Sequence, residues 1–414
     1  MPTMRTDILI LGGGIGGYEA YRRLARDLQR TKQPLTITVV DANNYYTFTP
    51  LLHEAATGGV EPAHCAIPLR ELVESPHQFV QATVERIDPA HKKVQTSAGV
   101  IDYTWCVMAL GSAVNYWNVP GAEEHTYNVR TLNAAMRFHN DLVKILESKQ
   151  STITLTIVGG GWTGVEVAGQ CAQLAKKDIA KKYPNKKIKI FLLEGGAAIL
   201  PQLPAAVREQ VRQRLKKSGV TIKLNELAKA VGSTTVTLSS GQSLASDLVI
   251  WTTGFENVAA CYVPDSMCTK GRLTVNERLQ HNAHTELYAI GDIAYAIDPT
   301  TNAPYGQLGE TAAAQAKFVA RDIINRLTKK PRSVFSFQSI GSLIPLGNWD
   351  GAARIGRLTF FGPLAWVTRH LVYLLVIPTI KAKFKIALDW ALHSFGGRYI
   401  LGTSQASPSR WDAK

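Results

Sequence analysis

A glycine-rich pattern occurs twice in this chain of 414 residues and limits the folds open to it. The two stretches are Thr6–Ala20 (TDILILGGGIGGYEA) and Leu155–Ala168 (LTIVGGGWTGVEVA). Each has a mostly apolar run, then three glycines, then a further glycine three residues on, and then a helical pattern. Short apolar runs suit parallel strands that are buried on both faces, and a glycine turn between strand and helix is typical of nucleotide-binding βαβ units. The repeat therefore predicts an α/β chain with two Rossmann-like dinucleotide-binding domains.

Each unit should consist of a strand, a helix and a second strand. The first unit is expected at Ile8–Leu11, Gly17–Leu28 and Leu35–Val40, and the second at Leu155–Val158, Gly164–Lys176 and Lys187–Leu193. Loose alternation over Gln81–Ile101 predicts a β-meander. Further elements are expected as strands at Tyr103–Leu110, Leu248–Trp251 and Leu287–Gly291, a helix at Glu310–Arg326, a linker at Thr328–Ser333 and a distinct tail from Phe335.

The first glycine motif has the spacing Gly12-x-Gly14-x-x-Gly17. The first glycine permits the tight turn, the second lets a pyrophosphate approach the backbone, and the third lets helix and strand pack closely. The positive end of the helix then faces the phosphates. Asp41 closes the next strand, where an acid holds a ribose 2′-hydroxyl. Because strand, helix and acid agree, we predict a dinucleotide site rather than an unliganded glycine-rich turn.

The second glycine motif repeats this spacing as Gly159-x-Gly161-x-x-Gly164, and Glu194 ends the next strand. A carboxylate at that position repels a 2′-phosphate, so it favours NADH over NADPH. The next residues, Gly195-Gly196-Ala197-Ala198, offer no cation that would accept the phosphate. The alternative for Glu194 is a solvated charge at the end of a strand.

The composition of the chain limits the kinds of partner that it is expected to bind. The net charge of +14 indicates an anionic partner, either nucleic acid or a membrane surface. The usual nucleic-acid motifs are missing from the sequence, so no nucleic-acid partner is expected. The five cysteines form no Cys-x-x-Cys pair and no zinc spacing, which predicts no metal site and reduced thiols. No secretory signal pattern precedes the first strand, and no run reaches the ~18 apolar residues of a spanning helix.

Two dinucleotide sites in one chain favour hydride transfer between a nicotinamide and a flavin. Four stretches then resemble the flavoprotein reductases with two dinucleotide-binding domains, and within that group the type II NADH:quinone oxidoreductases. They are TFTPLLHEAATG (Thr47–Gly58), IVGGGWTGVEVAGQ (Ile157–Gln170), WTTGF (Trp251–Phe255) and YAIGDIA (Tyr288–Ala294). Their order and spread extend the resemblance over nearly the whole chain.

The resemblance implies FAD as cofactor, NADH as co-substrate and a quinone as acceptor. It implies a discontinuous FAD-binding domain (residues 1–115 and 265–330), an inserted NADH-binding domain (116–264) and a C-terminal membrane-anchoring region (331–414). Asp292 would contact the ribityl chain of the flavin. The remaining residues that it assigns are Thr49, Pro50, Val84, Gly111 and Gly291 in the flavin site and Thr253 and Gly254 in the NADH site.

Three candidate catalytic residues follow from the same resemblance. Glu166 would lie beside the contact of nicotinamide and flavin; the alternative is a salt-bridge partner near a helix N-terminus, where a carboxylate is favourable anyway. The family commonly carries Ala-Gln-x-Ala-x-Gln-Gln near the flavin, and the best match here is Gly309–Gln315 (GETAAAQ). In this match Glu310 replaces the first glutamine and only Gln315 is kept. Both could present polar groups to a quinone carbonyl, or could be an acid and a solvated position of an ordinary helix.

The tail resembles the family's membrane anchor over Gly362–Ile400. Leu371–Ile380 is too short to span a bilayer and is interrupted by Pro378. Aliphatic and aromatic residues beside Lys381, Lys383 and Lys385 suit a helix that lies in the membrane interface. The alternative is a core helix or a dimer contact. We therefore expect a peripheral protein on the cytoplasmic face of the cell membrane, or a matrix-side equivalent, with a homodimer possible.

The resulting functional prediction is FAD-dependent oxidation of NADH with two-electron reduction of a membrane quinone, without proton pumping. Proton delivery to the quinone would use Glu310 or water. One alternative is a soluble NAD(P)H-flavin reductase that passes electrons to a protein such as a ferredoxin. Another is a flavin-based redox sensor. Disulfide reductase chemistry is disfavoured because the paired cysteines that it needs are missing from the sequence.

Overall fold

The structure is a computed structural model that describes residues 3–398 and 400–402. The chain forms two compact units, each assembled from three segments. Unit 1 comprises Met1–Thr47, Ala66–Ala113 and Phe255–Ser339, and unit 2 comprises Phe48–Cys65, Val114–Gly254 and Ile340–Lys414. Contacts thus group both Phe48–Cys65 and the tail with the second glycine motif. The functional domain boundaries drawn from the sequence stay a prediction.

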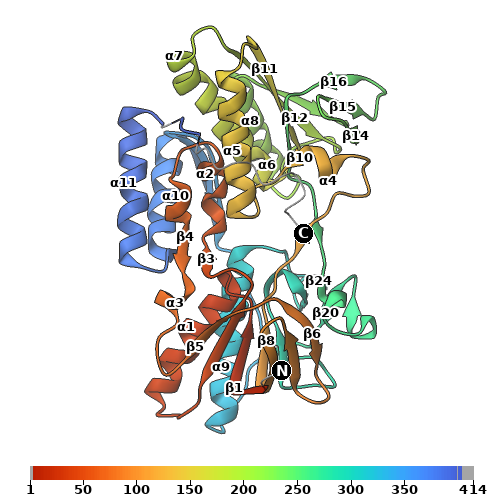
Figure 1. Ribbon diagram of the computed structural model, residues 1–414, viewed down its shortest axis with the longest axis vertical. Helices are drawn as coiled ribbons and strands as arrows, with labels where there is room; N and C mark the ends of the chain where they lie inside the picture. Colours follow the sequence, from red (N-terminus) through yellow and green to blue (C-terminus); the bar gives the residue numbers. More distant parts are fainter. Residues whose placement is uncertain (1–2, 399, 403–414) are drawn as a thin grey trace. The chain divides into compact units, whose positions relative to one another are not determined.

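Unit 1 is built on a sheet in which the strands run in the order β5-β2-β1-β8-β7-β6, and β21 also pairs with β8. The pairs of β1 with β2 and β8, of β2 with β5, and of β8 with β21 are parallel, whereas β6, β7 and β8 pair antiparallel. Helices α1 and α9 pack against each other (Figure 1). The elements of unit 1 are β1 (Thr3–Leu11), α1 (Ile15–Arg30), β2 (Ile37–Asp41), β3 (Tyr45–Thr47), β4 (Ala66–Pro68), α3 (Leu69–Leu72), β5 (Gln78–Gln81), β6 (Val84–Asp88), β7 (Lys93–Thr96), β8 (Gly99–Met108), β18 (Phe255–Glu256), β19 (Cys268–Thr269), β20 (Arg272–Thr274), β21 (Leu287–Ala289), β22 (Ala294–Tyr295), β23 (Ile297–Asp298), β24 (Ala303–Pro304) and α9 (Gly309–Leu327).

One strand of unit 1 differs from the sequence prediction. The last strand of the expected meander and the expected strand at Tyr103–Leu110 are a single strand, β8. Its first half pairs with β7, its second half pairs with β21, and β1 lies along its other edge. Both halves therefore have a strand on each side. Burial alternates along the first half, and the last three residues, Cys106–Met108, are all buried.

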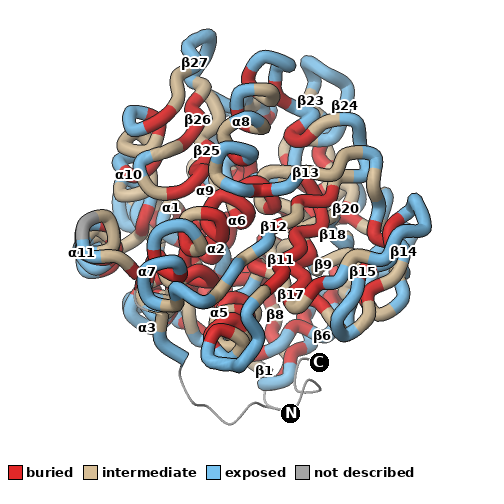
Figure 2. The backbone as a smooth tube through the Cα atoms, turned by 90° about the horizontal axis from the view of Figure 1, so that it is seen from above, coloured by how far each residue is buried: buried red, intermediate tan, exposed pale blue. Residues whose placement is uncertain are grey.

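Unit 2 has a parallel sheet in the order β10-β17-β11-β12-β13 and two smaller antiparallel sheets, β14-β15-β16 and β25-β26-β27. Strands β11 and β17 are buried almost throughout (Figure 2). The elements of unit 2 are α2 (Leu52–Ala56), α4 (Ala122–His125), β10 (Thr126–Tyr127), α5 (Leu132–Glu147), β11 (Thr152–Val158), α6 (Trp162–Gln173), α7 (Ala180–Lys182), β12 (Lys187–Glu194), α8 (Ala205–Lys217), β13 (Val220–Leu224), β14 (Ala228–Val231), β15 (Thr235–Leu238), β16 (Ser243–Ala245), β17 (Leu248–Trp251), β25 (Gly341–Gly347), β26 (Asp350–Ile355), β27 (Leu358–Phe361), α10 (Pro363–Val376) and α11 (Ile380–Gly396); the two-residue strand β9 (Ala113–Val114) lies where the chain passes from unit 1 to unit 2.

The predicted strands and helices of both glycine motifs are confirmed in β1, α1 and β2 and in β11, α6 and β12. The helix of the second unit departs from the prediction at its C-terminal end. Past Gln173 it continues as a π-helix over Leu174–Ile179. A π-turn inserts a residue relative to α-helical spacing and so changes which later side chains face the core. Asp178 in this turn is buried and accepts a hydrogen bond of 2.8 Å from the backbone N–H of Arg398.

The tail packs onto unit 2 through β25–β27, α10 and α11. β25 packs against α6, and α10 packs against β25, β26 and β27. α11 contacts the 3-10 helix Pro62–Cys65, which follows α2. The described tail is therefore part of the body of unit 2, and one side of it stays exposed, as described below.

Candidate functional site

The first glycine motif forms the turn between β1 and α1 in unit 1. Gly12 has a φ of +99°, and a Cβ on Gly17 would lie 1.8 Å from the carbonyl oxygen of Gly12. Only glycine fits there, which is the close packing that the motif predicts. Asp41 at the end of β2 accepts hydrogen bonds from the backbone N–H of Gly13 (2.6 Å) and of Asn43 (2.7 Å). The acid thus braces the turn beside the position expected for a ribose.

The start of α1 is open to a ligand. Its N-cap residue, Gly14, provides no side-chain cap, and the first turn contains no acidic residue. A Cβ built on Gly14 would meet no other atom within 4 Å. Helix N-termini leave their first N–H groups without partners inside the helix, and these groups bind phosphate well. The residues present therefore fit the pyrophosphate of a flavin dinucleotide.

The other predicted flavin residues of unit 1 lie at the ends of its strands. Gly291 follows β21 with a φ of +72°, and its backbone N–H donates a 2.6 Å hydrogen bond to Oε1 of Gln315 on α9. Asp292 accepts a 2.7 Å hydrogen bond from the hydroxyl of Ser112, the neighbour of Gly111. Val84 is a buried residue of β6. The Gly291–Asp292 turn and the turn at Gly111 are thus joined by a side-chain hydrogen bond.

The second glycine motif repeats the geometry of the first in unit 2. A Cβ on Gly164 would lie 1.8 Å from the oxygen of Gly159, and α6 begins at Gly161 without a side-chain cap. Glu194 accepts hydrogen bonds from the N–H groups of Gly160 (2.7 Å) and Gly196 (2.6 Å). The same carboxylate-to-glycine contact therefore occurs in both units.

The two remaining NADH candidates adjoin this turn. Thr253 lies in the loop after β17, and Gly254 next to it has a φ of +68°. A Cβ on Gly159 would lie 2.7 Å from the methyl group of Thr253. The Thr253 hydroxyl oxygen is buried and has no hydrogen-bond partner within the described residues. Buried polar groups are normally paired, so this hydroxyl fits a polar group of a bound dinucleotide.

Glu166 lies two residues past Gly164 on α6, which packs against α2. Its carboxylate oxygen Oε2 is 3.8 Å from Nδ1 of His53. Burial raises the pKa of Glu166 to about 7, although the charge of Arg369 acts in the opposite direction. A carboxyl group with this pKa exchanges its proton near neutral pH, which suits acid–base chemistry.

Three charged or titratable residues next to Glu166 were missed by the sequence analysis. Arg369 of α10 is almost fully buried and donates a 2.6 Å hydrogen bond to Glu54 of α2. Glu54 also accepts a 2.8 Å hydrogen bond from the indole of Trp390 on α11. We call Glu166, His53, Glu54 and Arg369 the Arg369 cluster. The sequence did contain one indication, because the apolar TPLLHEAATG stretch has two adjacent titratable residues, His53 and Glu54. The partner of Glu54, Arg369, lies 315 residues away in the chain.

Thr49 and Pro50, two predicted flavin residues, lie in the 3-10 helix Thr49–Leu51 that leads into α2. They belong to unit 2, whereas the other predicted flavin residues belong to unit 1. The Pro50 carbonyl accepts a 3.3 Å hydrogen bond from Arg369. This segment therefore connects directly to the Arg369 cluster.

The two candidates on α9 have different environments. Glu310 is exposed in the first turn of the helix and accepts a 2.8 Å hydrogen bond from Ser339. Gln315 is 1% exposed and bonds Gly291 as described above. Their roles toward a quinone stay a prediction.

Helices α10 and α11 expose an unusual number of large apolar side chains. On α11, Ile380, Phe384, Leu388 and Leu392 recur every fourth residue and are all exposed. On α10 the exposed residues are Leu364, Leu371, Val372, Leu375 and Val376. We call these nine residues the apolar face. Within the described residues, no helix is long and apolar enough to cross a bilayer.

Comparison with known proteins agrees with the presence of two dinucleotide-binding glycine motifs. The family described as pyridine nucleotide-disulphide oxidoreductase matches residues 6–316. Demethylphylloquinone reductase NdbB of Synechocystis is 30% identical over 416 residues, which cover 96% of this chain and 98% of that protein. A type II NADH:quinone oxidoreductase of Haemophilus influenzae is 27% identical, with 85% of this chain and 87% of that protein covered.

Solved structures show the same fold. NDH2 from Plasmodium falciparum in complex with NADH has a TM-score of 0.86 at 18% identity, and the match covers 96% of this chain and 99% of that one. A sulfide:quinone oxidoreductase from Aquifex aeolicus has a TM-score of 0.72 at 19% identity, covering 95% of this chain and 96% of that chain.

Proposed function

The chain belongs to the pyridine nucleotide-disulphide oxidoreductase family, as a type II NADH:quinone oxidoreductase, and we propose how its residues divide the reaction. NADH, a quinone and one proton from solvent give NAD⁺ and the quinol, with no proton pumped. The observation that carries this function is the pair of matching glycine cradles in one chain, each braced by a carboxylate. When bound, FAD supplies the two-electron carrier between the two substrates.

Unit 1 would hold the flavin dinucleotide. The N–H groups at the start of α1 would bind its pyrophosphate, and Gly12, Gly14 and Gly17 would give the backbone room to approach it. Asp41 would hold the ribose hydroxyl of the adenosine half. Asp292, oriented by Ser112, would bind the ribityl chain. Val84, Gly111 and Gly291 would line the same site. The sequence resemblance assigns Thr49 and Pro50 to the flavin as well.

Unit 2 would hold NADH on the second glycine motif. Both oxygens of Glu194 accept backbone hydrogen bonds, so its charge is fixed at the position that a 2′-phosphate of NADPH would approach. The repulsion between two negative charges there favours NADH. Thr253 and Gly254 would contact the dinucleotide from the loop after β17.

Glu166 would exchange the proton that quinone reduction consumes. The support is its pKa of about 7, which burial raises from the usual carboxyl range, and its place in a cluster of titratable groups. In the protonated form the carboxyl would donate a proton as the quinone takes up electrons, and it would recover that proton from solvent. Glu310 is the second candidate for this step because the sequence places it where the family carries a glutamine.

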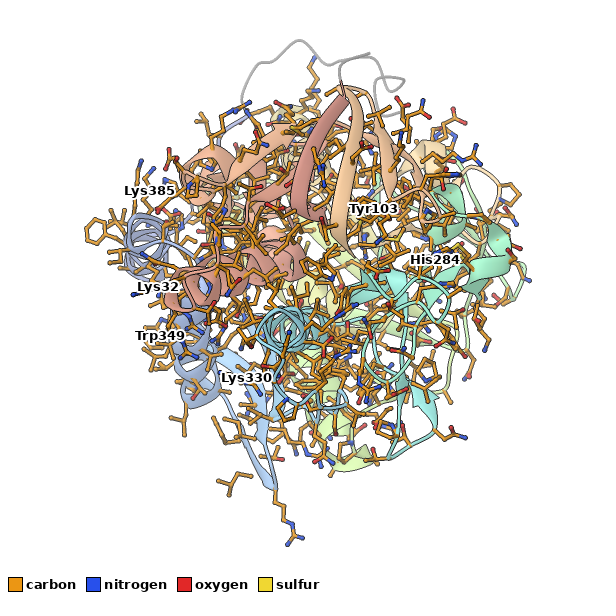
Figure 3. The ribbon with its side chains drawn as sticks, turned by 90° about the horizontal axis from the view of Figure 1, so that it is seen from below. Lys32, Tyr103, His284, Lys330, Trp349 and Lys385 are labelled. Atoms are coloured by element: carbon orange, nitrogen blue, oxygen red, sulfur yellow. The ribbon has the colours of Figure 1, made fainter. Side chains whose placement is uncertain are left out.

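The apolar face would dock onto the membrane from which the quinone comes. Lys381, Lys383 and Lys385 flank the stripe on α11, and Lys385 projects from that helix (Figure 3). Aliphatic and aromatic residues bordered by lysines suit an interface with anionic headgroups. We place the protein on the cytoplasmic face of the cell membrane, or its matrix-side equivalent. A homodimer that covers the same face is the second candidate.

The first test is NADH oxidation by the purified flavin-loaded protein with soluble ubiquinone and menaquinone analogues, and with NADPH as the comparison. Fast turnover with NADH and slow turnover with NADPH is the expected result. Flavin that NADH bleaches without any quinone being reduced would contradict the proposal and point to a protein acceptor or a sensor. A Glu310→Gln variant with unchanged quinone turnover would remove Glu310 as the proton source.

A further inference from the structure

The Arg369 cluster contains a histidine that the reaction described above does not use. His53 lies on α2, 3% exposed, between the charge pair of Glu54 and Arg369 on one side and Glu166 on the other. Its Nε2 is 3.3 Å from Nη2 of Arg369, and its Nδ1 is 3.8 Å from Oε2 of Glu166. Each ring nitrogen therefore faces a different charged partner.

The proton on the ring can be assigned from these partners. Arginine has only donors, so His53 Nε2 must accept the hydrogen bond from Arg369. The Glu54 oxygen nearest to Nε2 is 3.7 Å away and already accepts the 2.6 Å bond from Arg369. A neutral imidazole with Nε2 as acceptor carries its proton on Nδ1. Among the charged partners named here, the one at 3.8 Å from Nδ1 is Oε2 of Glu166.

His53 stays neutral where it lies. Burial and the charge of Arg369 lower the pKa of His53 to about 3, and Glu54 opposes this only in part. Burial acts against ionisation of Glu54, but the neighbouring charge of Arg369 outweighs it and brings the pKa of Glu54 to about 2. Trp390 adds a further hydrogen bond to the same carboxylate. Arg369 is therefore occupied by Glu54 on one side and holds His53 with the other.

The observed separation of 3.8 Å between His53 Nδ1 and Glu166 Oε2 is longer than a hydrogen bond. Ionisation of Glu166 attracts the Nδ1–H, and a small rotation of either side chain closes the gap, as happens at many acid–base sites. The other titratable or charged groups that face Glu166 are Arg369 and Tyr373 of α10 and Glu54 of α2. β25 also packs against α6 but has no titratable residue.

We infer that His53 is a positioning residue: with Nε2 held by Arg369, its Nδ1–H orients the carboxylate of Glu166 and stabilises its ionised form. This inference rests on the proposed role of Glu166 as the proton-exchanging group. The inference gives α2 a part in the quinone half-reaction. Through its neutral Nδ1–H tautomer, His53 would connect Arg369 of α10 with Glu166 of α6.

The test follows the protonated carboxyl of Glu166 directly, by infrared titration of the flavin-loaded protein. The band of Glu166 is isolated by subtracting the spectrum of Glu166→Gln. His53→Phe keeps the ring and removes the donor, so the midpoint of the titration should move upward by about one pH unit. His53→Asn keeps an amide N–H near the Nδ1 position, and its midpoint should stay close to that of the unchanged protein.

His53→Gln serves if the phenylalanine variant does not fold, because it keeps a polar contact with Arg369 but has no donor at the Nδ1 position. It should shift the midpoint upward like His53→Phe. An unmoved midpoint in the donor-less variant that folds, or equal shifts in that variant and His53→Asn, would overturn the inference. His91→Phe, at an exposed histidine of unit 1, is the control and should leave the midpoint unchanged.

The same experiment separates this inference from the proposed function. Quinone turnover that keeps its rate and pH profile in Glu166→Gln would refute the proton-exchange role of Glu166. The infrared midpoint would still report whether His53 acts on that carboxyl group. A shifted midpoint in the His53 variants, together with unaltered turnover in Glu166→Gln, therefore counts against the proton-exchange role of Glu166 and for the His53–Glu166 interaction.

Discussion

The side-chain oxygen of Gln315 accepts a 2.6 Å hydrogen bond from the backbone N–H of Gly291. Gln315 is the single glutamine of the family pattern that the helix start keeps, and it is buried on α9. The bond holds the turn that carries Asp292, so Gln315 would support the proposed flavin site without touching the flavin.

Gln315→Leu should therefore weaken both folding and flavin retention. The substitution leaves a buried N–H without a partner, which costs about 1–3 kcal/mol. Denaturant unfolding and the ratio of flavin to protein after gel filtration measure the two effects. Lys317→Leu, at an exposed position of the same helix, is the matched control and should change neither. Full flavin occupancy in Gln315→Leu would contradict this prediction.

Glu194→Gln should lower the preference for NADH over NADPH by about tenfold or more, which corresponds to about 1.4 kcal/mol. The amide removes the charge that repels a 2′-phosphate while it keeps one acceptor for Gly160 or Gly196. The ratio of the two kcat/KM values is the measurement. Glu226→Gln changes a nearby exposed carboxylate that bonds Ser239, and it should leave the ratio unchanged.

Arg369→Met should destabilise the protein by about 3–5 kcal/mol, because Glu54 keeps its buried charge and loses its partner. Adding Glu54→Gln should recover much of that loss, since the uncompensated charge is gone. Denaturant unfolding of both single variants and the double variant gives the coupling. The exposed pair Arg22–Glu19 on α1 is the control, where Arg22→Met should cost less than about 1 kcal/mol.

Glu166→Gln should raise the melting temperature at about pH 8 and have little effect at about pH 5. The folded-state pKa of Glu166, about 7, lies above its ordinary value of 4.5 because of burial. The folded protein thus binds this proton more tightly than the unfolded chain does, so stability falls as the pH rises from about 4.5 to 7. The amide does not ionise and avoids that loss. A gain in melting temperature that is equal at both pH values would refute this explanation.

Binding to anionic vesicles should depend on the apolar face and its lysines. Phe384→Glu introduces a charge into the exposed stripe of α11 and should abolish most co-sedimentation. Replacing Lys381, Lys383 and Lys385 by Gln should weaken binding about 100-fold at low salt, at about 1 kcal/mol per lysine, and less at high salt. Leu227→Glu, an exposed leucine of unit 2 outside the apolar face, is the control. Unchanged vesicle binding in Phe384→Glu would favour the dimer instead.

The two glycine motifs were predictable because the residues that form each of them lie close together in the sequence. Glycine spacing, a strand before it and an acid after the next strand are all readable within a short stretch, and the structure places Asp41 and Glu194 on the glycine turns as that pattern implies. The Arg369 cluster was not predictable in the same way. Its arginine and glutamate are far apart in the sequence, and only packing of the tail onto α2 makes them partners.

Two further differences have the same physical origin. β8 merges two predicted strands because its sheet neighbours change along its length, which the alternation pattern of one strand does not report. The π-helix after α6 contains Asp178, which contacts Arg398, again between distant parts of the chain. A sequence pattern indicates which side of a single helix or strand is buried. It does not report which distant segments that helix or strand contacts.

Helices α10 and α11 are joined to the rest of unit 2 through two buried arginines. Arg369 joins α10 to α2, and Arg398, just past α11, is buried with its guanidinium on the carbonyls of Thr57 (3.1 Å) and Gln170 (3.4 Å). The two helices are therefore held at two points by buried hydrogen bonds to the rest of unit 2. Any surface that binds the two helices would therefore also fix the orientation of unit 2, the unit that carries the second glycine motif.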